Sequence, residues 1–150
     1  QYRQQGADRL MGLPDLVCTP GALNPTVNQG NLATTICKGG YTGTIRPPQS
    51  VTGPLKTRGL KDYGQPNTPS AYEEDHLLPL EVGGAPSDPK NLWPQPDYAT
   101  PHPSSFDHNP KDPIEFKVRN AICSGKITLA AGQSALLGNW TTAIAVLHLH

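Results

Sequence analysis

The pattern of apolar and polar positions changes near residue 72 and divides the 150-residue chain into two parts. Residues 1–70 show no sustained apolar periodicity, and turn-forming Pro and Gly pairs recur along them. We therefore predict a mostly irregular N-terminal lobe over residues 1–70, with short strands near residues 34–36 and 41–46.

A strand-like alternation begins at Tyr72. Leu78, Leu80 and Val82 alternate with other residue types, which is the period of two expected of a β-strand. We predict a strand over residues 72–82 that ends at the Gly83-Gly84 turn. A second short strand at residues 91–93 would return beside it, forming a hairpin with a long connection.

Two helices are predicted after the hairpin. Asp112 is the expected N-cap of the first, with Pro113 at the first helical position and Glu115 completing a capping box. Thr128 can cap the second, over residues 128–147, whose apolar positions fall on one face. The predicted fold class is α+β, in one domain with a hairpin-helix core over residues 72–124.

Composition limits the possible functions. Apolar residues make up 35% of the chain, charged residues 16%, and the formal net charge is zero. Neutrality argues against a protein that coats itself in nucleic acid, but it is compatible with an enzyme that touches a few phosphates. No span approaches the roughly 20 apolar residues of a membrane helix, so no membrane partner is expected. The polar first residues contain no secretion signal, although processing would remove one.

Three cysteines suggest one disulfide. Cys18 and Cys37 enclose a Gly-, Asn- and Thr-rich segment that has little means of ordering itself. A bridge between them would stabilise the fold by about 3 kcal/mol in the chain-entropy model. It would place the protein outside the reducing cytoplasm, in a secreted or periplasmic location. The alternative is two reduced, buried thiols, and Cys123 is expected to be a buried helix residue.

Residues 56–61 carry three positive charges, on Lys56, Arg58 and Lys61. Two interpretations stay open for them: an ordinary solvated loop, or an edge that faces phosphates.

The second half of the chain resembles a known family. The motif DHLLPLEVGG, then NLW, then HNPKD occurs in an order similar to that of the HNH endonuclease superfamily, in particular to its small exported bacterial members. The resemblance covers about a third of the chain well. It implies a ββα-metal core, a divalent metal ion and hydrolysis of phosphodiester bonds.

The chemistry of this reaction matches two adjacent residues. Cleaving a phosphodiester requires a base to deprotonate water and a cation to stabilise charge on the phosphate. His76 is suited to be the base because its unperturbed pKa lies near neutrality. Asp75 is a suitable oxygen ligand for Mg, Mn, Ni or Zn. Neighbouring side chains on a strand point to opposite faces, so this pair converges only if the strand ends, twists or bulges there.

The resemblance implies further roles. Asn91 would hold the ring of His76, His108 would be the third metal ligand, and Lys111 would contact a phosphate. Glu115 could replace His108 as a ligand, against its capping-box role, and His102 is a weaker alternative. Trp93 is expected in the core rather than stacked on a base.

Three functions are thus in competition. The first is a metal-dependent nuclease of low sequence specificity, with nucleic acid as substrate, DNA in preference to RNA. The second is an HNH-like binding or structural module without catalysis, and the third is a metal-assisted hydrolase of a smaller substrate. A monomer is expected, and no inhibitor or immunity protein can be inferred from the chain.

Overall fold

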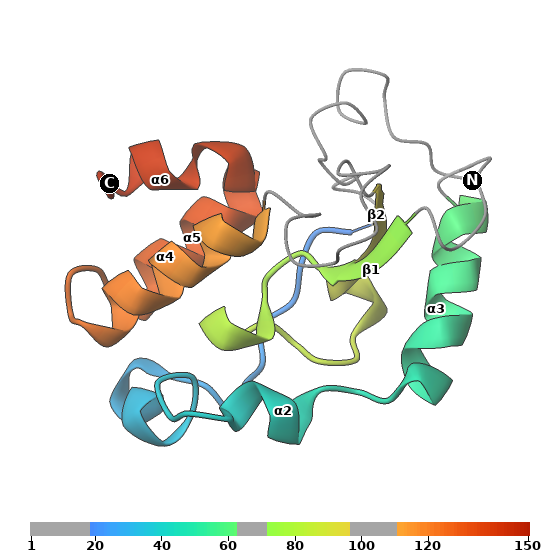
Figure 1. The fold of residues 1–150 in the computed structure, drawn as a ribbon, viewed down its shortest axis with the longest axis horizontal. Coiled ribbons are helices and arrows are strands. Elements are labelled where there is room, and N and C mark those ends of the chain that lie inside the picture. Colours follow the sequence, from blue (N-terminus) through green and yellow to red (C-terminus); the bar gives the residue numbers. More distant parts are fainter. Residues whose placement is uncertain (1–18, 63–71, 97–110) are drawn as a thin grey trace.

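The structure is a computed structural model that describes residues 19–62, 72–96 and 111–150. Helices and a small antiparallel sheet are combined in it, as the predicted α+β class requires (Figure 1). The sheet lies near the centre, helices α4, α5 and α6 pack together on one side, and α3 stands on the other. None of the helices described is long and apolar enough to cross a membrane.

The sheet is the predicted hairpin with different boundaries. Strands β1 (Tyr72–His76) and β2 (Leu92–Pro96) pair antiparallel, with Asp75 opposite Trp93 and His76 opposite Leu92. The prediction that the first strand runs to residue 82 was wrong, because β1 ends at His76 and a 3-10 helix, η3 (Leu80–Val82), follows.

The residues after His76 explain the early end of the strand. Leu77, Leu78, Leu80 and Val82 are all buried. A pleated strand with one buried face would bury only every second residue, so this segment folds back on itself instead. Trp93 is fully buried, which confirms its predicted place in the core.

The N-terminal lobe is more helical than predicted. The 3-10 helix η1 (Gln29–Thr34) is followed by a turn over residues 35–37, and the short helix α2 (Tyr41–Ile45) occupies the second segment, so both strand predictions were wrong. The side chains of Asn28 and Asn31 form a capping box at the start of η1, which fixes a helical turn. The 14-residue helix α3 (Gln49–Asp62) lies beside β2, despite Pro54 within it.

Helix α4 (Lys111–Cys123) begins earlier than predicted, at Lys111. Asp112 is therefore in the first turn and not at the N-cap, so the capping box predicted for Glu115 does not form. As a consequence Lys111 and Glu115, four residues apart, project from the same helix face, and both are buried.

The predicted C-terminal helix is divided into three elements: α5 (Leu129–Asn139), the 3-10 helix η6 (Trp140–Thr142) and α6 (Ala143–Val146). Thr128 caps α5 as predicted, and its Oγ1 accepts a hydrogen bond of 3.1 Å from the backbone N–H of Ala131. The break lies at Asn139, whose backbone is extended and whose side chain accepts from the Thr141 N–H.

The main core lies between α4, α5 and the segment around η3. Val82, Val118, Ile122, Leu136 and Trp140 are among its buried members. Gly132 of α5 faces α4 so closely that a Cβ there would lie 2.7 Å from Cδ1 of Ile122. This glycine therefore permits the close approach of the two helices.

The disulfide pairing also differs from the prediction. Cys37 is bonded to Cys123, at the end of α4 and 86 residues away along the chain, so the predicted Cys18–Cys37 bridge was wrong. Cys18 lies outside the described residues. The buried Ile36 explains the placement, because its carbonyl accepts hydrogen bonds from Arg119 of α4 and brings Cys37 beside that helix. A disulfide is compatible with an oxidising, extracellular location.

Candidate functional site

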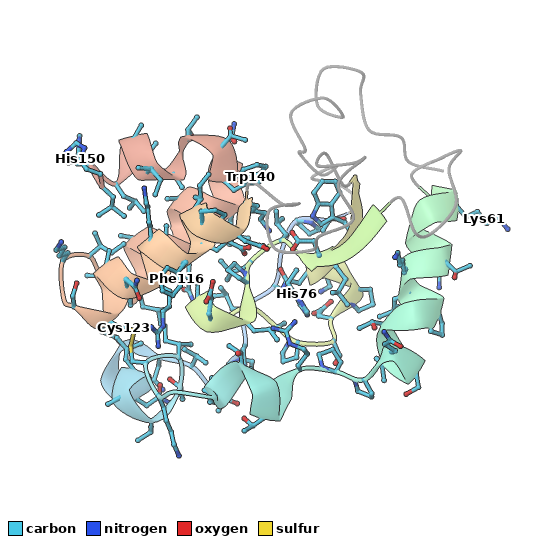
Figure 2. The ribbon with its side chains drawn as sticks, in the orientation of Figure 1. Lys61, His76, Phe116, Cys123, Trp140 and His150 are labelled. Atoms are coloured by element: carbon cyan, nitrogen blue, oxygen red, sulfur yellow. A yellow bond between two sulfur atoms is a disulfide. The ribbon has the colours of Figure 1, made fainter. Side chains whose placement is uncertain are left out.

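A cavity of about 340 Å³ opens where the end of β1, η3, α2 and α4 meet. Its lining is mostly polar and consists of Thr42, Arg46, Asp75, His76, Pro79, Leu80, Glu81, Asp112 and Glu115. Asp75 and His76 face it together because β1 ends at His76, which is the local strand end that their convergence was expected to require. Figure 2 shows His76 near the middle of the molecule, next to this end of the hairpin.

The ring of His76 is fixed by a backbone carbonyl. Its Nε2 lies 2.8 Å from the carbonyl oxygen of Pro86. A carbonyl only accepts hydrogen bonds, so Nε2 carries the proton and donates, and in the neutral ring Nδ1 keeps the lone pair. Burial lowers the pKa of His76 below 6.5, although the Pro86 carbonyl and Asp75 oppose this change. The ring is therefore mostly neutral at pH 7, as a general base must be.

Asn91 forms hydrogen bonds to the backbone of the loop after β1 and not to the ring of His76. Its side chain is fully buried. Its Oδ1 accepts from the N–H of Leu78 at 2.9 Å, and its Nδ2 donates to the carbonyls of Leu78 at 2.9 Å and Ala85 at 3.0 Å. The predicted direct contact with His76 is therefore replaced by an indirect one. Asn91 holds Ala85, and the next residue, Pro86, holds the histidine.

Gly84 is required by the same loop. A Cβ at this position would lie 1.8 Å from the carbonyl oxygen of Leu78 and 2.9 Å from Nδ2 of Asn91. Gly84 is thus required because a side chain at this position has no space. Gly83 adopts a left-handed backbone with φ of 87°, which favours glycine.

Lys111 is placed differently from its predicted role. Its side chain is fully buried, and Nζ lies 2.5 Å from Oδ2 of Asp75 and donates to the carbonyl of His76 at 2.7 Å. Burial would lower the pKa of this lysine, but the charges of Asp75 and Glu115 outweigh that effect and raise it. Lys111 is thus a buried ammonium that joins α4 to the end of β1, and it is not exposed to contact a phosphate.

Glu115 faces the cavity from the next turn of α4. It is only 4% exposed, and its Oε2 lies 3.6 Å from Nζ of Lys111 without a hydrogen-bond partner. Burial, opposed by Lys111, raises its pKa well above the usual 4.5. Burial also raises the pKa values of Asp112 and Glu81 on the same wall. The charges of Arg119 and Arg46 oppose the rise at Glu81, and those of Lys111 and Arg46 oppose it at Asp112.

The donor set fits a hard divalent cation in part. Carboxylate oxygens are the ligands that such ions prefer, and Oε2 of Glu115 is buried, accepts no hydrogen bond and has the 3.6 Å ion pair with Lys111 as its contact. Asp75 and Glu115 are the described residues that would hold the ion. In the part of the chain that the structure describes, no group of three or more His, Cys, Asp or Glu side chains is arranged to hold a metal. The predicted ligand His108 and its alternative His102 lie outside the described residues.

Arg46 was missed as a site residue. It lies at the end of α2 and lines the cavity, where its charge acts on Glu81 and Asp112. Among the described residues its guanidinium makes no hydrogen bond or ion pair. The lobe thus contributes one wall of the cavity.

In comparisons with known proteins, the chain matches no protein-family model, no curated protein and no solved structure.

Proposed function

We propose that the protein is a metal-dependent nuclease of the HNH type, with His76 as general base. The observation that carries this proposal is the state of the His76 ring. Nε2 is bound to the Pro86 carbonyl, the pKa is lowered, and the ring lines a cavity that is also lined by carboxylates and by the Arg46 side chain.

The proposed role of His76 is to take a proton from water on Nδ1. A neutral imidazole is the reactive form of a base, and a pKa below 6.5 keeps it neutral at the pH of most compartments. When His76 becomes an imidazolium, Asp75 and the Pro86 carbonyl stabilise its charge. Asn91 contributes by holding the loop that presents this carbonyl.

Arg46 is the proposed phosphate contact, in place of Lys111. A guanidinium presents planar, paired donors that match phosphate oxygens, and Arg46 has no such partner among the described residues. Lys111 instead orients Asp75 toward the cavity. Asp75 and Glu115 would hold a divalent ion, which when bound supplies charge stabilisation at the phosphate and the leaving oxygen.

The experiment is to incubate the purified protein with plasmid DNA, single-stranded DNA and RNA. Each substrate is tested with EDTA and with added Mg, Mn, Ni or Zn, beside His76→Ala and the matched control His148→Ala, an exposed histidine near the end of α6. We expect metal-dependent cleavage, DNA being cut in preference to RNA, which is lost in His76→Ala and kept in His148→Ala. Absence of cleavage with every metal would refute the proposal.

A second function, a binding or structural module without catalysis, is favoured by one observation. Oδ2 of Asp75 is already paired with the ammonium of Lys111, and the same carboxylate would have to coordinate a metal ion. If the protein is such a module, no divalent ion binds, and calorimetric titration with Mn or Zn gives no heat. For either function we propose a secreted or periplasmic location, on the strength of the Cys37–Cys123 bond.

A further inference from the structure

Phe116 is an aromatic side chain of α4 that the core does not use. Its side chain is 55% exposed, and it belongs to neither cluster of buried apolar residues, whereas Ile114 of the same helix packs against the main core. A single exposed apolar residue is common on protein surfaces and is not by itself a site. The position of Phe116 relative to the cavity is therefore the feature that has to be examined.

The neighbours of Phe116 in the helix place it at the rim of the cavity. Asp112, four residues earlier, lines the cavity, and residues four apart on a helix share a face, with Cβ atoms about 5–6 Å apart. Arg119, three residues later, donates to the carbonyl of Ile36 in the N-terminal lobe at 3.1 Å. Phe116 thus lies on the face of α4 that extends from the cavity to the lobe.

The direction of the side chain brings the ring closer to the cavity. Long side chains of a helix lean toward its N-terminus and cover the preceding turn, which for Phe116 is the turn of Asp112. Arg46, the proposed phosphate contact, acts on the same residue, because its charge opposes the rise of the Asp112 pKa. In the view of Figure 2, Phe116 lies between His76 and Cys123. An exposed ring and a guanidinium are thus both neighbours of one carboxylate of the lining.

We propose that Phe116 is a stacking platform for one base of a single-stranded nucleic acid whose scissile phosphate lies in the cavity. This inference rests on the proposed function and specifies its substrate. Each phosphate of a nucleic acid is flanked by two nucleosides, so a base lies close to any phosphate that enters the cavity. An apolar ring at the rim can cover the face of that base and remove both surfaces from water.

Stacking on a protein ring requires a base with a free face. In a duplex the neighbouring bases cover both faces, whereas unpaired bases can be splayed out and stacked on aromatic side chains. Every base has such a face, so a platform adds affinity with little sequence preference. The substrate class that fits Phe116 is therefore single-stranded nucleic acid, read without a base-specific code.

The test uses the full chain with His76→Ala as parent, so that the substrate stays intact. Phe116→Ala and Phe116→Leu remove the ring, and Phe116→Trp keeps an aromatic ring. The matched control is Val146→Ala, which changes an exposed apolar residue of α6. Fluorescence anisotropy measures binding of a labelled 12-nucleotide single-stranded DNA, of its duplex, and of the same strand with abasic spacers in place of the bases. Circular dichroism verifies folding.

We expect Phe116→Ala and Phe116→Leu to bind the single strand at least about fivefold more weakly, since removing an aromatic platform costs about 5- to 150-fold in affinity per base. Phe116→Trp should bind as the parent does, and the fluorescence of the introduced indole should be quenched by the strand. Val146→Ala should stay within about twofold. The abasic strand and the duplex should each bind the parent and Phe116→Ala with equal affinity.

Several outcomes would overturn the inference. Parent-like binding of the single strand by Phe116→Leu would show that the ring is not needed, and absence of binding by the parent would remove the ligand. An equal loss on the abasic strand would show that Phe116 does not contact a base. A fall in mass on Phe116→Ala substitution, seen by sedimentation with unchanged DNA binding, would assign the ring to contact with a second copy of the chain.

Cleavage separates this inference from the proposed function. With His76 restored, Phe116→Ala should cleave the single strand with a raised KM, but with the kcat and the pH profile of the unsubstituted protein. If the unsubstituted protein cleaves the strand and Phe116→Ala has the same KM, the inference fails and the nuclease proposal stands. If the strand quenches the fluorescence of Phe116→Trp and nothing is cleaved, the nuclease proposal fails and the stacking platform stands.

Discussion

Lys111 and Asp75 form a buried ion pair in which Nζ lies 2.5 Å from Oδ2 and the lysine side chain is completely excluded from solvent. The pair connects the first turn of α4 to the end of β1, 36 residues earlier in the chain. It places a positive charge among carboxylates beside the proposed base.

Replacing Lys111 should destabilise the fold strongly. In Lys111→Met, Asp75 and Glu115 remain buried without a compensating charge, and breaking a buried pair by removing one partner costs about 3–5 kcal/mol. Urea unfolding measures this loss. The control is Lys117→Met, an exposed lysine of the same helix, which should change stability by less than about 0.5 kcal/mol. Equal, small effects in both variants would show that the ion pair is absent in solution.

Glu115 should make stability depend on pH. Its pKa in the folded protein is raised well above 4.5, so the folded state holds this proton more tightly than the unfolded chain does. The resulting stabilisation is complete below about pH 4.5 and is lost as pH rises through the raised pKa. Relative to the parent, Glu115→Gln should therefore gain stability as the pH rises from 4.5 to 8. Thermal unfolding of both proteins across that range, in EDTA, gives the difference. A difference independent of pH would contradict the assignment.

Asn91 should be needed for both folding and activity. Asn91→Ala leaves the N–H and carbonyl of Leu78 and the carbonyl of Ala85 without their partner, and each buried group left unsatisfied costs about 1–3 kcal/mol. Asn91→Asp keeps the size and the acceptor but loses both donated hydrogen bonds, so it should also be destabilised. Chemical denaturation provides the measurement, with the exposed Asn120→Ala as control. Parent-like stability of Asn91→Asp would be incompatible with the described loop.

The disulfide should be identifiable as Cys37–Cys123. A bond that closes a loop of 86 residues stabilises by about 4–5 kcal/mol in the chain-entropy model. Cys37→Ser and Cys123→Ser should each lose this contribution, and Cys18→Ser should keep it. Peptide mapping of the unreduced protein by mass spectrometry identifies the bond directly. A peptide that links Cys18 to Cys37 would restore the pairing expected from the sequence and contradict the structure.

The sequence was informative where a feature depends on near neighbours. Thr128 was identified as a helix cap from its immediate context. The hairpin was predicted too, but the alternating residues 78–82 and the two glycines at 83 and 84 lie in the connection between its strands and not in a strand. The convergence of Asp75 and His76 required only that a strand end at that point, which it does.

Features that depend on distant contacts were not predictable in this way. Cys37 meets Cys123 because the core brings Ile36 to α4, and no local pattern records that contact. Lys111 was interpreted as exposed because the helix start was placed after it. Helix α3 was missed because Gly53, Pro54 and Gly59 argue against a helix when only local propensity is considered.

The rate of DNA cleavage as a function of pH, for the parent and for His76→Ala, tests the central claim most directly. With saturating metal, the parent should lose activity on the acid side with a midpoint below pH 6.5, because burial lowers the pKa of His76. His76→Ala should be slower by about 100-fold or more and should show no such midpoint. Cleavage by His76→Ala at the parent rate and with the same pH profile would contradict the assignment of His76 as the base.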